Sequence, residues 1–167
     1  FSGVNTYKGD TNVQSGRLAL ANVSAIFQES ETFVRGDGHL DLYTHSADGS
    51  IDEGKTFKID QIDISGSGQL SVSARNPLIS ENINLNASSG GITVEIFEKT
   101  EGREMNKAPI RVSEKFIYKD GSLIVRAPLS DDPEGTWNII DGDVENADKL
   151  AAKTYLVTSN RSTYEFK

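Results

Sequence analysis

The acidic residues of this chain include two clusters whose spacing could support acid–base chemistry. Asp60 and Asp63 form the first, and Asp131, Asp132 and Glu134 form the second. Enzymes that cleave polysaccharides use paired carboxylic acids, one as the proton donor and the other as base or nucleophile. Residue alternation directs Asp60 and Asp63 outward, as such a site requires. A chain of net charge −8 is expected to carry acids on its solvated faces anyway, and we predict no catalytic site.

The remaining candidates for chemistry have no supporting pattern. The two histidines, His39 and His45, have no second metal ligand at a suitable spacing, the chain has no cysteine, and nothing points to a Ser-His-Asp triad. Aspartate–glycine pairs fail the spacing of calcium-binding loops and repeats, so type I′ turns explain them better. These pairs are Asp37-Gly38, Asp48-Gly49, Asp120-Gly121 and Asp141-Gly142. We therefore predict no metal and no cofactor.

An Arg-Gly-Asp tripeptide occupies Arg35, Gly36 and Asp37. One interpretation is integrin adhesion through a loop tip. The other is a turn before the strand at residues 39–43, because glycine and aspartate are typical chain-reversal residues. A tripeptide match carries little information, so we favour the turn.

The overall charge limits the classes of partner. The net charge of −8 and the sequence pI of about 4.8 argue against nucleic acid or anionic lipid as the main partner. No apolar run approaches the ~20 residues that a membrane helix needs, so we predict a chain that is not membrane-embedded. The sequence opens with Phe1 and shows no signal peptide, and we interpret it as a segment of a longer protein.

Short alternating runs of apolar and polar residues recur along the chain, separated by glycine, serine, asparagine and proline. This pattern predicts an all-β fold and leaves sandwich, barrel and solenoid open. Residues 62–94 favour the solenoid, because small polar side chains there can hydrogen-bond along stacked strands. We predict a right-handed parallel β-helix. Its expected inward residues are Leu18, Leu20, Leu70, Val72, Ile83, Leu85, Ile92 and Val94.

The chain is expected to divide into three parts. Residues 1–97 are predicted to form the β-helix coils, and the charged segment 98–108 a projecting loop. Residues 109–167 are richer in aromatic and β-branched residues and are predicted to cap the coils, with a β-hairpin turning at Asp120-Gly121. Trp137 is expected to be mostly buried in this cap.

The first twenty residues contain the pattern Gly-x-Asn-Thr-Tyr-x-Gly-x-Thr-x-Val-x-x-Gly-x-Leu-x-Leu. The matching positions are Gly3, Asn5, Thr6, Tyr7, Gly9, Thr11, Val13, Gly16, Leu18 and Leu20. This pattern resembles the passenger-associated repeat of bacterial autotransporters, which are secreted β-helical proteins of Gram-negative surfaces. Residues 62–94 also resemble the generic coils of autotransporters and filamentous haemagglutinins.

The resemblance implies a non-enzymatic segment near the C-terminal end of an autotransporter passenger, at the bacterial surface or secreted. It implies an autochaperone role, in which terminal coils and a cap fold first and template the coils above them. The implied partners are the neighbouring coils of the same passenger and its own outer-membrane β-barrel. The alternative is an adhesin that binds a host surface protein through residues 98–108 or the Arg35 loop. A glycan-active β-helix is the third interpretation.

Overall fold

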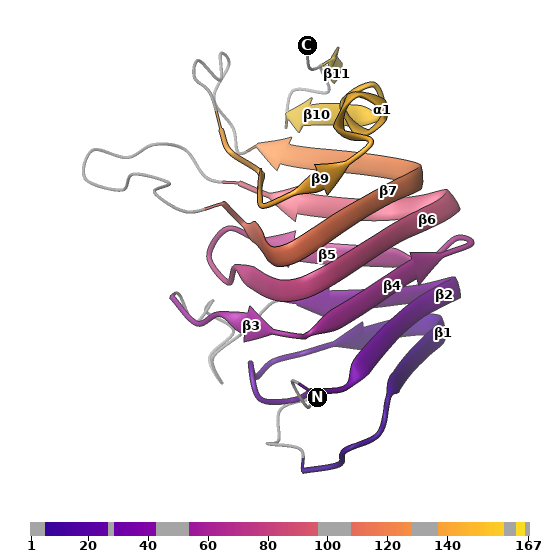
Figure 1. The fold of residues 1–167 in the computed structure, drawn as a ribbon, viewed down its shortest axis with the longest axis vertical. Helices are drawn as coiled ribbons and strands as arrows, with labels where there is room; N and C mark the ends of the chain where they lie inside the picture. The colour runs from indigo at the N-terminus through magenta and orange to yellow at the C-terminus, as the bar shows by residue number, and fades with distance from the viewer. Residues whose placement is uncertain are drawn as a thin grey trace.

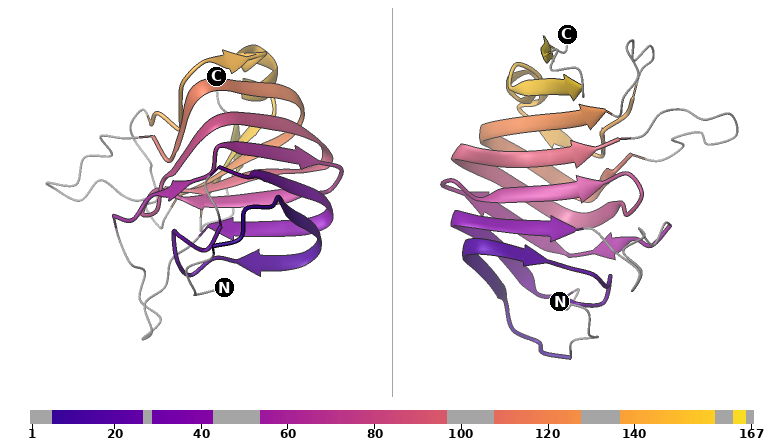
Figure 2. Two further views of the ribbon diagram at one scale, coloured as in Figure 1. Left: turned by 60° about the horizontal axis from the view of Figure 1, so that its bottom comes forward. Right: turned by 180° about the vertical axis from the view of Figure 1, so that it is seen from behind.

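A computed structural model of the chain describes residues 6–26, 29–42, 54–96, 108–127, 137–158 and 163–165. The strands lie one above the other, from β1 near the N-terminus to β10 and β11 near the C-terminus (Figures 1 and 2). The elements are β1 (Thr11–Ala19), β2 (Glu31–Leu42), β3 (Phe57–Lys58), β4 (Gln61–Ser65), β5 (Gln69–Ser73), β6 (Leu78–Glu95), β7 (Ile110–Ala127), β8 (Ile140–Asp141), β9 (Val144–Glu145), α1 (Ala147–Ala151), β10 (Thr154–Thr158) and β11 (Thr163–Glu165).

The eleven strands of the described residues belong to one sheet, whose main order is β1-β2-β4-β6-β7-β10-β11. Every pairing between these strands is parallel except that of β10 with β11, which is antiparallel. β2 pairs along its first half with β4 and along its second half with β5, and both β4 and β5 pair with β6. These four strands close on themselves as a parallel barrel, and the remaining strands lie outside it.

The all-β class is confirmed, but the predicted right-handed parallel β-helix with a C-terminal capping hairpin is wrong. The finding that overturns it is the closed four-stranded parallel barrel with outer strands. The predicted hairpin does not form either, because β7 runs through Asp120 and Gly121 as one strand and pairs in parallel with β6. The physical reason lies in the glycines. We predicted that they reverse the chain, whereas in the structure they bend strands that then continue.

Two glycines show why the strands bend where they do. A Cβ atom on Gly38 would lie 2.1 Å from the carbonyl oxygen of Val13, and one on Gly68 would lie 2.4 Å from that of Val34. Real Cβ contacts are essentially never shorter than 3.0 Å. Only glycine therefore allows the neighbouring backbone to approach this closely at the bend.

The core is built from side chains that stack in rows across the paired strands. Val13, Val34, Ile64 and Leu85 are aligned by the parallel registers of β1, β2, β4 and β6. A second row aligns Leu18, Leu40, Leu70 and Ile92 through β1, β2, β5 and β6. Of the residues predicted to point inward, all but the half-buried Leu18 are buried. Alternation therefore identified the core face correctly.

The C-terminal end of the sheet is covered by elements that differ from the strands before it. Helix α1 buries the side chain of Leu150, and the side chain of Asn146 at the start of the helix donates a 2.9 Å hydrogen bond to the carbonyl oxygen of Tyr118 in β7. Trp137 is half-buried and packs against the core. Among the described residues, no helix is long and apolar enough to cross a bilayer.

Candidate functional site: the β1 edge and its polar cluster

The free edge of β1 is the first feature of the candidate site. Within the described part of the chain, β1 pairs with β2 alone. A strand paired on one side directs part of its backbone N–H and C=O groups away from the sheet, where they are available to another strand. We call this side of the strand the β1 edge.

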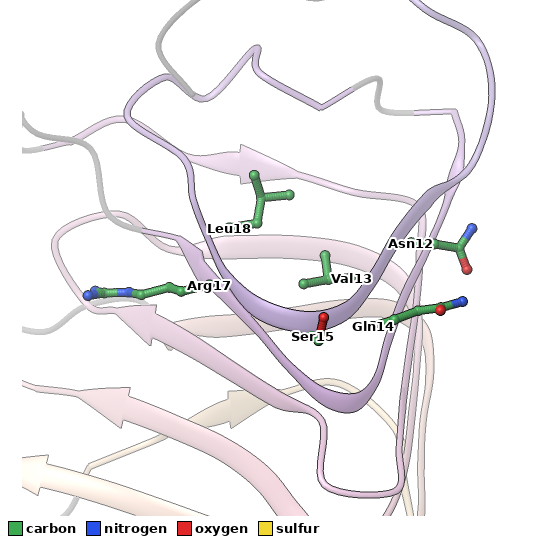
Figure 3. Close-up of a pocket in the computed structure, with 6 residues that line it drawn as sticks. All are labelled: Asn12, Val13, Gln14, Ser15, Arg17 and Leu18. Atoms are coloured by element: carbon green, nitrogen blue, oxygen red, sulfur yellow. The ribbon is translucent and has the colours of Figure 1, made fainter.

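An open hollow of about 420 Å³ lies at the β1 edge. Figure 3 shows Val13 and Leu18 pointing into the space enclosed by the bend of the strand, whereas Asn12, Gln14 and Arg17 point away from it. The hollow thus combines two apolar side chains with a polar rim. Its full lining is Asn12, Val13, Gln14, Ser15, Arg17 and Leu18.

Beside the hollow, a polar cluster joins β1, β2 and β5. Arg17 of β1 pairs with Asp41 of β2, its Nη2 donating to the Oδ2 oxygen. The ring Nε2 of His39, also in β2, lies 2.7 Å from the Ser71 hydroxyl oxygen in β5. Parallel registers place Arg17 opposite His39 and Asp41 opposite Ser71, which brings the four side chains together.

Asp41 is the most buried charged group in this cluster. Its side chain is 2% exposed, whereas that of its partner Arg17 is 64% exposed. The second carboxylate oxygen of Asp41, Oδ1, is buried and has no hydrogen-bond partner. Burial of a carboxylate is unfavourable unless the charge is paired. The Arg17 guanidinium is therefore the main compensation for this buried charge.

Burial lowers the pKa of His39, and the nearby carboxylate of Asp41 opposes this effect by raising the pKa. The positive charges of Arg17 and Arg126 lower it further. The net direction is downward, so the neutral imidazole is favoured at neutral pH. In this form it can either accept a proton from the Ser71 hydroxyl in the hydrogen bond or donate to its oxygen.

A serine beside a histidine is the pairing that activates a nucleophile in hydrolases. Here Ser71 is only 8% exposed, so a substrate has little access to its oxygen. The third member of a triad would be a carboxylate that accepts a hydrogen bond from the other ring nitrogen. Asp41 Oδ1 accepts no such bond, so the cluster has a serine–histidine contact without the element that would orient the imidazole for catalysis.

Sequence reasoning did not identify this cluster. The available signal was that His39 and Asp41 are two positions apart and therefore lie on the same face of one strand. Ser71 comes from another strand, and only the register between β2 and β5 places it beside His39. No spacing in the sequence gives that register.

Asp60 and Asp63, the acidic pair considered above for acid–base chemistry, are both held in hydrogen bonds. Asp63 accepts hydrogen bonds at both carboxylate oxygens, from the Gln61 amide at 2.9 Å and the Asn84 amide at 2.7 Å. The carbonyl oxygen of Asp60 accepts from the backbone of Glu81 and Asn82. The Asn84 contact joins β6 to β4 through side chains, the Gln61 contact lies within β4, and the Asp60 contacts join the residue before β4 to β6 through the backbone. Asp131, Asp132 and Glu134 lie outside the described residues.

The Arg-Gly-Asp tripeptide lies within β2 at the bend of the strand. The Arg35 guanidinium lies 4.4 Å from the centroid of the Phe33 ring, a cation–π contact, and Gly36 has a φ of 58°. The register with β1 shifts at this point. The tripeptide is therefore part of a paired strand, and both the turn and the loop-tip interpretations are corrected.

The type I′ turn explanation of the described aspartate–glycine pairs is also wrong. Such a turn needs positive φ at both central residues, and Asn146 is the sole described non-glycine residue with positive φ. Asp37-Gly38 and Asp120-Gly121 lie inside strands, and Gly142 follows β8. His45, Asp48-Gly49 and the predicted loop at residues 98–108, apart from Ala108, fall outside the described residues.

Among the described residues there is no group of three His, Cys, Asp or Glu side chains that could hold a metal ion. The arrangement that remains is a free strand edge with a hollow of mixed polar and apolar lining, next to a polar cluster that shares Arg17 with it. Comparison with protein-family models, curated proteins and solved structures gave no match.

Proposed function

We propose that this chain is a non-enzymatic structural module of a secreted bacterial surface protein of the autotransporter kind. In this role its C-terminal end folds first and serves as a template for the strands on its N-terminal side. The observation that carries the proposal is the difference between the two ends of the sheet. The C-terminal end carries helix α1 and the short antiparallel strand β11, which pairs with β10 alone, whereas the N-terminal end finishes on β1, a longer parallel strand that pairs with β2 alone among the described strands.

The difference matters because each stacked strand gains much of its stability from its neighbours. β6 and β7 pair from Leu78–Ile110 to Glu95–Arg126, and the side chains of Ile110, Phe116 and Val125 are fully buried. β1 has a single partner and leaves much of its length exposed. A well-covered end lowers the nucleation cost for strands added later, which is the physical requirement for a folding template.

The proposal places the chain at the bacterial surface or in the secreted fraction, with neighbouring strands of the same polypeptide as its main partners. The adhesin alternative rested on the Arg35 loop and on residues 98–108. The contact of Arg35 with Phe33 inside a paired strand removes support from the first of these.

Amide hydrogen exchange measured along the chain tests the proposal. We expect amides in β6, β7 and β10 to exchange at least tenfold more slowly than those in β1, because local opening is easiest where contacts are fewest. A binding module has no reason for such polarity. Uniform protection, or stronger protection of β1 and β2 than of β7, would reject the template role and leave the adhesin as the better hypothesis.

A further inference from the structure

We propose that Asp120 and Gly121 in β7 form a self-modification site. There the backbone nitrogen of Gly121 closes onto the carboxyl group of Asp120, and the aspartate becomes isoaspartate through a cyclic imide. The inference does not depend on the proposed function. Three features of the described residues carry it: the contact between the two reacting groups, a glycine without a partner in the sheet, and a buried tyrosine that holds this glycine.

The two reacting groups are already in contact. The Gly121 N–H donates a hydrogen bond to Oδ1 of Asp120, with 2.9 Å between nitrogen and oxygen. The carbon that would be attacked, Cγ, is one bond from that oxygen. The Asp120 side chain is exposed, so its carboxyl group can rotate about the Cβ–Cγ bond and turn the face of Cγ toward the nitrogen. Groups held this close react with little further ordering.

The Gly121 nitrogen is also not committed to the sheet. The register between β6 and β7 passes from the pair Asn86–Asp120 to the pair Gly91–Ser122 and leaves Gly121 without a partner. The φ angle of Gly121 is 121°, a conformation that glycine adopts readily and other residues rarely adopt. The backbone therefore presents this nitrogen to the preceding side chain without loss of a pairing with β6.

A buried tyrosine holds Gly121 from its other side. The Tyr118 hydroxyl donates a 2.9 Å hydrogen bond to the carbonyl oxygen of Gly121, and Tyr118 is only 3% exposed. The carbonyl oxygen of Tyr118 in turn accepts the bond from Asn146 at the start of α1. Gly121 is thus restrained next to Asp120, and Tyr118 is a positioning residue for the reaction.

The other described aspartate–glycine pairs lack this arrangement. Within the part of the chain that the structure describes, the glycine nitrogen makes no hydrogen bond to the aspartate side chain in Asp37-Gly38 or Asp141-Gly142. Their glycines are packed more tightly as well. An added Cβ atom would lie 2.1 Å from a backbone carbonyl oxygen at Gly38 and 2.4 Å at Gly142, against 3.0 Å at Gly121. One chain therefore presents the same dipeptide in a favourable and in two unfavourable settings.

The reaction balances with water as its only reagent. The lone pair of the Gly121 nitrogen forms a bond to Cγ of Asp120, the C–OH bond at Cγ breaks, and the amide hydrogen leaves with the hydroxyl group as water. Water then opens the cyclic imide at either carbonyl. Attack at Cγ restores aspartate, whereas attack at the main-chain carbonyl carbon gives isoaspartate, in which the main chain runs through Cβ.

The product keeps its negative charge and adds one methylene to the main chain between the two halves of β7. Because Gly121 has no register partner, the added length falls where the ladder with β6 is already interrupted. The converted chain is therefore expected to remain folded. The site would give the protein a slow chemical mark of its age at the bend of β7.

Incubation of the full chain in heavy-oxygen water at neutral pH tests the inference. Every passage through the imide adds one solvent oxygen to the aspartate, so peptide mass spectrometry gives a rate for each aspartate–glycine pair. The same chain unfolded in urea supplies the reference rate. We expect the ratio of folded to unfolded rate at Asp120 to exceed that at Asp37 and Asp141 by at least about tenfold, with isoaspartyl peptide formed at Asp120.

Two variants serve as controls. Tyr118→Phe removes the hydroxyl and keeps the ring, so it should lower the ratio at Asp120 and leave the other two pairs unchanged. Asp120→Glu keeps the charge but lengthens the side chain, so it should abolish label uptake at position 120. A ratio at Asp120 no higher than at the other two pairs would overturn the inference, as would label uptake there without isoaspartyl peptide. If Tyr118→Phe does not fold, the wild-type comparison decides alone.

Discussion

Replacing Gly38 by alanine should destabilise the protein far more than a surface glycine substitution. The added Cβ atom would lie 2.1 Å from the carbonyl oxygen and 2.6 Å from the carbonyl carbon of Val13. Both atoms are backbone, so no side-chain rotation relieves the contact. To reach the 3.0 Å that real Cβ atoms respect, β1 must move away from β2 by about 0.9 Å in a closely packed region.

The expected cost follows from that displacement. Overpacking in a well-packed region costs roughly 1–3 kcal/mol, and lengthening a neighbouring backbone hydrogen bond costs about 1 kcal/mol more. Alanine lowers the conformational entropy of the unfolded chain relative to glycine, which offsets about 0.4–1 kcal/mol of this cost. The net loss is about 1–3.6 kcal/mol, which corresponds to a fall in Tm of roughly 2–14 °C for a chain of this size.

Urea unfolding and thermal unfolding of Gly38→Ala measure this loss. Gly68→Ala should behave similarly, because its Cβ atom would lie 2.4 Å from the Val34 carbonyl oxygen. Gly9→Ala is the matched control, since a Cβ atom there meets nothing within 4 Å, and its effect should stay within about 0.5 kcal/mol. If Gly38→Ala is no less stable than Gly9→Ala, the close approach of β1 to the bend of β2 is wrong.

Two further predictions concern the polar cluster. Arg17→Met should destabilise the chain by about 1–2 kcal/mol in urea, less than the full cost of an unpaired buried charge because Arg17 is largely exposed. Adding Asp41→Asn should recover most of that loss, and a double variant no more stable than the single one would contradict the pairing argument. The depressed pKa of His39 means that the unfolded chain binds its proton more readily. Stability relative to His39→Gln should therefore be full above about pH 7 and fall as the pH drops through the unfolded pKa of about 6.5, and an opposite slope would show that Asp41 dominates over burial.

The sequence predicted well those features that depend on local alternation. The buried positions of Leu70, Ile83 and Val94 follow from a period of two along a strand. The cross-strand hydrogen bonding expected of small polar side chains in residues 62–94 also forms, because the Asn84 amide in β6 donates to Asp63 in β4. Each of these features requires knowledge of one strand and its immediate surroundings.

The features that the sequence did not predict depend on pairing between distant strands. Asp120-Gly121 has the composition of a hairpin turn, yet β7 continues through it because the strand on each side pairs with β6. The same ambiguity applies to Gly36-Asp37-Gly38, where the backbone of β1 lies against the bend. Glycine permits both a reversal and a close approach, and the residue alone does not distinguish them. The neighbouring strand decides between the two, which is also why the contact between Ser71 and His39 follows from register and not from any motif.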